Sequence, residues 1–118
     1  MDELVKQIRD FARARDWEQF HNPKNLVMAL AGEVGELSEL FQWLTAEQAV
    51  GIMSGVHDPE RVRHELADVM IYSLRLSDVL GIDPAEAIRE KLAINEAKYP
   101  VPLARGSARK ATELGAAE

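Results

Sequence analysis

The chain has 118 residues, 47% of them hydrophobic, so it is long enough for one globular domain with a core and too short for two. Its formal net charge of −6 argues against a general nucleic-acid binder, because phosphates require a basic surface, and the absence of cysteine excludes disulfides and thiolate metal sites. Residues 1–4 are acidic rather than signal-peptide-like, and no apolar run approaches the roughly 20 residues that span a bilayer, so we expect a cytoplasmic protein without a membrane partner.

Helical periodicity recurs four times along the chain, and strand signals are nearly absent. The first helix is expected over about 2–15. Its apolar side consists of Leu4, Ile8 and Phe11. Asn22 and Pro23 then provide an N-cap and a proline at the first helical position. A second helix is therefore predicted from this point to about residue 44.

The second half of the chain contains the remaining helix signals. Thr45 is expected to cap a short helix that continues to about residue 53. A longer helix is predicted over 59–80, where Gly81 ends it. Asp83 resembles the start of a capping box for a further helix, which must end before Pro100.

These elements predict an all-α fold, a four-helix bundle over 1–100 followed by a largely irregular tail over 101–118. The helix at 59–80 carries Met70, Ile71 and Leu74 outside its main apolar stripe. A helix that is apolar nearly all round must be covered on several sides. This favours a homo-oligomer, and the alternative is a central helix covered within its own subunit.

Two pairs of acidic residues form the main candidate site: Glu33 with Glu36, and Glu65 with Asp68. Their i, i+3 spacing places the members of each pair on one helix face. Glu33 and Glu65 fall inside the apolar stripes of their helices, where a carboxylate is retained only if it is paired, protonated or bound to a cation. Such hard oxygen ligands suit Mg²⁺ or Mn²⁺. A di-iron site is disfavoured because it needs Glu-x-x-His motifs, and solvated helix charges are the plain alternative.

A polar row on the helix after Asp83 complements the acids. Lys91, Asn95 and Lys98 are spaced i, i+4 and i+7 and so share one face. Two ammonium groups and an amide near a metal suit a polyphosphate, although a solvated lysine face is equally compatible with the pattern. The chain has no Gly-rich Walker motif, which excludes an ordinary P-loop mechanism.

Aromatic residues form a third group, which consists of Trp17, Phe20, His21, Trp43 and Tyr72. Within the predicted helices, Trp43 lies two turns after Glu36 on the same flank, and Tyr72 lies one turn after Asp68. An aromatic wall beside a metal–phosphate site can hold a flat base by stacking. Phe20 is expected in the core. For His21, a structural or capping role is the alternative to ligand binding.

Together these motifs resemble the all-α nucleoside triphosphate pyrophosphohydrolases of the MazG-like superfamily, and most closely the dCTP pyrophosphatase branch. The segments that carry the resemblance are 16–26, 32–37, 41–43, 65–72, 95–100 and 103–114. The chain departs from the pattern at Gly32, where broader members often have another Glu, and at Ala111, where animal relatives have an aromatic residue.

The resemblance implies an enzyme that needs Mg²⁺, with Glu33, Glu36, Glu65 and Asp68 as metal ligands. It implies a base pocket of Trp17, His21, Trp43 and Tyr72, and phosphate contacts from Lys91, Asn95, Lys98 and Arg109. It also implies a homotetramer, built as a dimer of dimers.

The reaction expected from this resemblance converts dCTP or a related modified nucleotide to the monophosphate and pyrophosphate, as housekeeping of the nucleotide pool. Glu36 is the expected base for the attacking water, and Glu33 and Lys91 are the other expected catalytic residues. Two alternatives stay open. One is a phosphoribosyl-ATP pyrophosphohydrolase of the same superfamily, and the other is a non-catalytic nucleotide-binding helical module.

Overall fold

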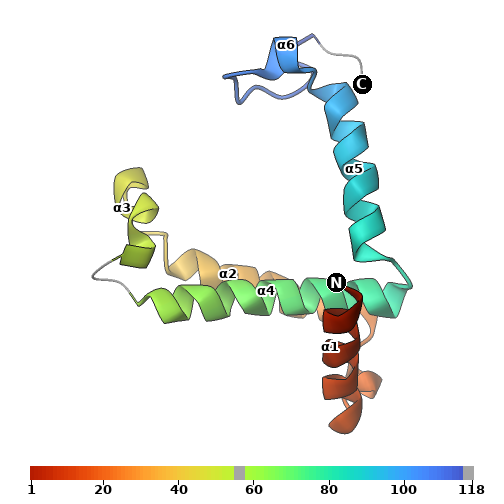
Figure 1. Cartoon of the computed structure of the whole chain (residues 1–118). Coiled ribbons are helices and arrows are strands. Elements are labelled where there is room, and N and C mark those ends of the chain that lie inside the picture. The colour runs from red at the N-terminus through yellow and green to blue at the C-terminus, as the bar shows by residue number, and fades with distance from the viewer. Residues whose placement is uncertain (55–57, 116–118) are drawn as a thin grey trace. The chain divides into compact units, whose positions relative to one another are not determined.

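The computed structural model describes residues 1–54 and 58–115, and within these ranges every regular element is a helix (Figure 1). The elements are α1 (Asp2–Ala14), η1 (Glu18–Phe20), α2 (Pro23–Glu39), α3 (Ala46–Val50), η2 (Ile52–Ser54), α4 (Pro59–Leu80), α5 (Pro84–Lys98) and α6 (Val101–Ala104). The all-α prediction is therefore confirmed. Among the described residues, no helix combines the length and the hydropathy that a membrane crossing requires.

Helix α1 packs against α4 through a face other than the predicted one. Its buried residues are Val5 and Ala12, whereas Leu4 and Phe11 are each 52% exposed. The buried face is continued by Arg9, which forms an ion pair with a carboxylate of α4. This polar contact helps to set the rotation of α1, which apolar periodicity alone misassigned by one residue.

Helix α2 begins where the sequence predicts and ends earlier. The Asn22 side chain accepts a hydrogen bond from the backbone N–H of Asn25, and Pro23 occupies the first turn. The helix ends at Glu39, so the predicted end near residue 44 is wrong. From Leu40 onward the backbone closes tight turns instead, as in the bond from the N–H of Leu44 to the carbonyl of residue 41.

Helices α2 and α4 lie side by side and run in opposite directions (Figure 1). The most buried large side chain, Leu26 of α2, is 1% exposed, and Val62 of α4 is also buried. Ile52 of η2 is buried as well, next to the start of α4. Burial of these side chains provides the main favourable free energy for this pairing.

Local sequence signals account for the boundaries of the remaining helices. Thr45 and Gln48 form a capping box at the start of α3. Asp58 and Asp83 each accept a backbone N–H bond at the starts of α4 and α5. Gly81 ends α4 in the left-handed region, with φ 71°, which glycine adopts without the Cβ clash of other residues.

The chain divides into two compact units, Met1–Ile82 and Asp83–Glu118. The acidic pairs and most of the aromatic residues belong to the first unit, and α5, α6 and the basic tail belong to the second. The predicted boundary between residues 100 and 101 stays a prediction, as does the four-helix bundle.

Candidate functional site

The centre of the candidate site is a cluster of three carboxylates between α2 and α4. Glu33 and Glu36 lie one turn apart on α2, and Glu65 faces them from α4. Each offers one carboxylate oxygen, and these three atoms all lie within 4.8 Å of one another. This spacing allows one cation to contact all three residues, so the cluster fits a divalent metal with oxygen ligands.

Burial and mutual repulsion favour protonated carboxyl groups in this cluster. Burial, followed by the neighbouring Glu36 carboxylate, raises the pKa of Glu33 to about 7. The same two causes, in the same order, raise the pKa of Glu65. Arg61 opposes the shift at Glu65, but its Nε lies 4.0 Å from the carboxylate and its side chain is 55% exposed. Compensation from this arginine is weak because solvent screens it.

Two oxygen atoms of the cluster have no hydrogen-bond partner. Oε2 of Glu33 and Oε2 of Glu65 are buried, and within residues 1–54 and 58–115 neither accepts a hydrogen bond. Leaving a buried acceptor unsatisfied costs about 1–3 kcal/mol, and more when the group is charged. A divalent cation would satisfy both atoms and remove the repulsion, so these residues fit such a group.

The fourth predicted ligand, Asp68, lies one turn after Glu65 on α4. Its negative charge contributes to the raised pKa of both Glu33 and Glu65, which places it near the cluster. It is not among the three residues whose oxygen atoms lie within 4.8 Å of one another. Its role as a ligand stays a prediction.

Two of the predicted base-pocket residues lie together just before α2. The rings of Trp17 and His21 are tilted, with centroids 6.3 Å apart. Trp17 also meets Phe11 edge to face at 5.7 Å. Phe20, expected in the core, is 57% exposed, so that prediction is wrong. The short η1 helix turns Phe20 outward and leaves His21 facing α4.

The other two base-pocket residues lie farther along the chain. Trp43 belongs to the turn after α2 and is 87% exposed. The prediction that it lies on the helical flank of Glu36 is wrong, because α2 has already ended at Glu39. Tyr72 is on α4, one turn after Asp68, as predicted.

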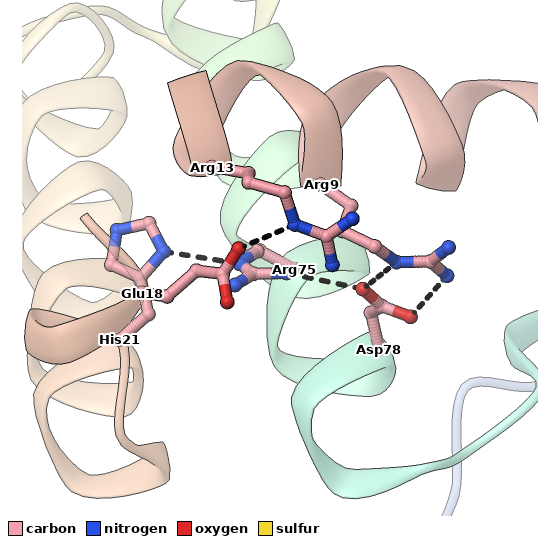
Figure 2. A network of polar contacts seen from close by, with 6 residues as sticks. All are labelled: Arg9, Arg13, Glu18, His21, Arg75 and Asp78. Atoms are coloured by element: carbon pink, nitrogen blue, oxygen red, sulfur yellow. Dashed lines mark hydrogen bonds and ion pairs between the residues drawn. The ribbon is translucent and has the colours of Figure 1, made fainter. Parts of the chain in front are cut away.

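A polar network joins α1, η1 and α4 beside His21 (Figure 2). Arg75 of α4 is the one charged residue in the described ranges that is fully buried, at 6% exposure. It donates from Nε to Nδ1 of His21 at 3.0 Å and from a terminal nitrogen to Asp78 at 3.1 Å. Asp78 also accepts two bonds from Arg9, at 2.7 and 2.8 Å. These contacts tie the His21 segment firmly to α4.

The sequence prediction did not include Arg75 or Asp78. Both are charged residues on a side of α4 where apolar and polar residues alternate, so helical periodicity does not predict that they are buried. A signal was available in their i, i+3 spacing, which suits an ion pair on a helix. The partners of this pair come from residues 54 and 69 positions away, which local patterns do not identify.

The predicted phosphate contacts all belong to the second unit. Lys91, Asn95 and Lys98 lie on α5, and Arg109 follows α6. Asn95 and Lys98 are half-buried, and Lys91 and Arg109 are exposed. Their part in the site stays a prediction.

Comparison with known proteins places the chain among nucleotide hydrolases. The sequence model of the MazG-like family matches residues 28–114. dCTP pyrophosphatase 1 of Homo sapiens is 43% identical over 114 residues, which cover 97% of this chain and 67% of that protein. The dATP/dGTP diphosphohydrolase of cyanophage S-2L is 40% identical over 76 residues, 64% of this chain and 56% of that protein.

A solved structure is similar as well. The crystal structure of a pyrophosphatase from Archaeoglobus fulgidus aligns with a TM-score of 0.78 and 40% sequence identity. The alignment covers 85% of this chain and 92% of that one. This likeness supports the all-helical fold and agrees with the family match.

Proposed function

Because the chain belongs to the MazG-like family, we propose that it is a pyrophosphohydrolase that converts dCTP or a modified cytosine nucleotide to the monophosphate and pyrophosphate. The observation that carries this proposal is the carboxylate cluster. Glu33 and Glu65 each bury an unpartnered oxygen within reach of Glu36. Folding retains such an arrangement at a cost, which binding of a cation offsets.

We assign the metal site to Glu33, Glu36 and Glu65, with Asp68 as the fourth ligand. Their oxygen donors suit Mg²⁺, with Mn²⁺ as the substitute. When bound, the metal would supply positive charge against the triphosphate and the departing pyrophosphate. Glu33 would release the proton that its raised pKa retains near neutral pH.

Glu36 is the proposed general base. It is the exposed member of the cluster, so its carboxylate is open to water. It would accept a proton as a water oxygen forms a bond to the α-phosphorus. The bond from the α-phosphorus to the bridging oxygen then breaks, and pyrophosphate leaves with its electron pair.

Lys91, Lys98, Asn95 and Arg109 are the proposed phosphate contacts. Three of them are cations, and charge-assisted bonds to phosphate oxygens are stronger than neutral ones. Lys91 would donate to the leaving pyrophosphate and so act in catalysis.

The proposed base pocket contains Trp17, His21, Trp43 and Tyr72. One face of α4 supports this pocket. On it the acids are followed by Tyr72, at i+7 from Glu65, and by Arg75, at i+10, which contacts His21. This face extends about 15 Å along the helix, at 1.5 Å per residue. A nucleotide lying along α4 would therefore place its phosphates at the acids and its base near Trp17, His21 and Tyr72. Trp43 follows the opposite end of α2, so it would reach the base from another subunit.

We further propose a homotetramer, a dimer of dimers, that acts in the cytoplasm. Large apolar side chains are open to solvent on both units, among them Met28 at 64% exposure, Met70 at 55% and Leu92 at 58%. Exposed large apolar side chains on several helices support their burial against further copies of the chain. Light scattering tests the proposal, which predicts four times the chain mass of 13.2 kDa.

A panel of nucleotides tests the function. We expect dCTP to yield dCMP and pyrophosphate in equal amounts with Mg²⁺ and neither product with EDTA. Because one relative is named for dATP and dGTP, purine nucleotides form the second arm of the panel. A clear preference for dATP or dGTP would reject the cytosine assignment and keep the reaction, whereas release from no nucleotide would reject both.

A further inference from the structure

The imidazole of His21 is held in one orientation by a buried guanidinium. Nε of Arg75 lies 3.0 Å from Nδ1 of His21, and the arginine is 6% exposed. Figure 2 shows the bond crossing from α4 to the segment that precedes α2. The contact is specific to Nδ1 and leaves Nε2 free of this interaction.

The chemistry of arginine decides where the proton of His21 resides. The Arg75 Nε always carries hydrogen and is only a donor, because the guanidinium does not lose its proton in proteins. Nδ1 must therefore accept with its lone pair. The single N–H of a neutral imidazole is then on Nε2.

The arginine is itself anchored. Its terminal nitrogen donates to Asp78 at 3.1 Å, and Asp78 also receives two bonds from Arg9 of α1. Three charge-assisted bonds converge on one half-buried carboxylate. The guanidinium therefore keeps its Nε aimed at His21 without help from a ligand.

We propose that Arg75 is a positioning residue, which fixes His21 as a neutral Nε2–H donor that recognises a hydrogen-bond acceptor on the nucleotide base. The proposal rests on the proposed function in one respect, that the ligand of His21 is a nucleotide. The acceptors available on a cytosine are its carbonyl oxygen and its unprotonated ring nitrogen. A protonated ring nitrogen at the same place would meet the Nε2–H donor and be rejected.

The charges around His21 agree with a neutral ring. Burial and then the Arg75 charge lower the pKa of His21, and Glu18 opposes them. Glu18 is itself paired with Arg13 at 2.8 Å, which weakens its influence on the ring. Protonation at Nδ1 would require the bond from Arg75 to break. His21 therefore stays neutral, with its one N–H on Nε2, through neutral pH.

The first test is the tautomer of His21 in the nucleotide-free protein, measured by ¹⁵N–¹H correlation spectra of the histidine rings. His21→Gln identifies the signals by their loss. We expect Nδ1 to resonate as an unprotonated nitrogen and Nε2 as a protonated one. A protonated Nδ1 of His21 in the unaltered protein would overturn the proposal.

The second test uses Arg75→Met, which keeps the approximate volume and removes the donor. We expect a mixture of tautomers, a rise in the pKa of His21 and a rise of about three- to tenfold in KM for dCTP, the value of one neutral hydrogen bond. Since His21 does not touch the reacting phosphorus, kcat should stay close to that of the unaltered enzyme. Arg63→Met makes the same substitution in an exposed pair with Glu60 of the same helix. It is the matched control and should leave tautomer and KM unchanged.

A double variant separates positioning from a purely structural role. His21→Ala removes the imidazole, so no donor remains for Arg75 to position. Arg75→Met should therefore raise KM no further in that background. An equal rise in both backgrounds would overturn the positioning role.

The proposed function can fail separately. If no nucleotide releases pyrophosphate, recognition of a base by His21 is rejected with it, while the tautomer spectrum still decides whether Arg75 fixes the ring. If pyrophosphate is released and KM is unchanged in Arg75→Met, the function stands and the positioning role is rejected.

Discussion

Glu33 of α2 and Glu65 of α4 each bury one carboxylate oxygen that has no hydrogen-bond partner in the described part of the chain, although the two residues face each other across the helix pair. This arrangement destabilises the metal-free protein, because burial and repulsion both disfavour the charged forms. Stability and metal binding should therefore be coupled.

Glu33→Gln should separate these two effects at pH 8. Removing one charge should raise the stability of the metal-free protein by about 1–2 kcal/mol, on the scale of 1.36 kcal/mol per pKa unit. The same change should abolish most of the rise in Tm that Mg²⁺ produces in the unaltered protein, because a ligand is lost. Glu39→Gln, an exposed acid at the end of the same helix, is the control and should leave both quantities unchanged.

The pH dependence of the metal-free protein should reflect Glu33. Its folded pKa of about 7 lies above the ordinary value of 4.5, so the folded state binds more protons between these values. The stabilisation is complete below about pH 4.5 and is lost as the pH rises through 7. Mg²⁺ affinity should show the opposite trend and increase through pH 7, because the ligand must be deprotonated. Calorimetric titration at pH 6 and pH 8 measures this, and a pH-independent affinity would contradict the assignment of Glu33 as a ligand.

Asp78→Asn should destabilise the protein by about 2 kcal/mol, since hydrogen bonds to charged groups contribute about 1.5–3 kcal/mol. Bonds from Arg9 are the main cause that lowers the pKa of Asp78, so its stabilisation is present above the ordinary value of 3.8 and is lost as the pH falls below it. Asp10→Asn breaks an exposed pair with Lys6, where solvent screens the two charges, and should cost much less stability. Urea unfolding at pH 7 measures the free energy of unfolding of both variants. Equal decreases in this free energy would show that burial of the network adds nothing to its stabilising effect.

Trp43→Ala should affect binding without affecting folding. The side chain is 87% exposed, so the Tm should be nearly unchanged. If the indole stacks on the base, KM for dCTP should rise by about tenfold or more, since stacking contributes about 1–3 kcal/mol per base. Val50→Ala, at a position 90% exposed, should change neither. An unchanged KM in Trp43→Ala would remove this residue from the base pocket.

Gly81→Ala should destabilise α4 through its backbone alone. A Cβ at this position would meet no atom within 4 Å, so the cost is the left-handed conformation, about 1–2 kcal/mol. Gly81→Asn should cost less, because asparagine tolerates this region better. Thermal unfolding compares the two, and an equal loss of Tm would point to a cause other than backbone strain.

Helices with explicit start and stop residues were predictable from the sequence. The bounds of α4 agree with the prediction because Pro59 marks its first turn and Gly81 its end. The end of α2 at Glu39 is marked by neither glycine nor proline, so the sequence contains no local signal for it. There the capping box of Thr45 starts a new helix, and the intervening backbone must leave its helical path.

The candidate site was predictable to the extent that it depends on helical periodicity. Glu33 and Glu65 were found because an acid in an apolar stripe is visible at 100° per residue. The buried Arg75 was not found, because its partner His21 lies 54 positions away and only tertiary packing brings the two together. The rotation of α1 was missed for a similar reason, since Arg9 is placed by Asp78 at the far end of the unit's longest helix.

The most direct test of the account is the product stoichiometry of dCTP hydrolysis in ¹⁸O-labelled water, with Mg²⁺ or EDTA, for the unaltered protein and Glu36→Gln. The account predicts one pyrophosphate per dCMP, label in dCMP alone, no turnover in EDTA and a loss of at least about a hundredfold in the variant, within the range for a general base. Orthophosphate as the product, label in pyrophosphate, or full activity of Glu36→Gln at saturating Mg²⁺ would contradict it.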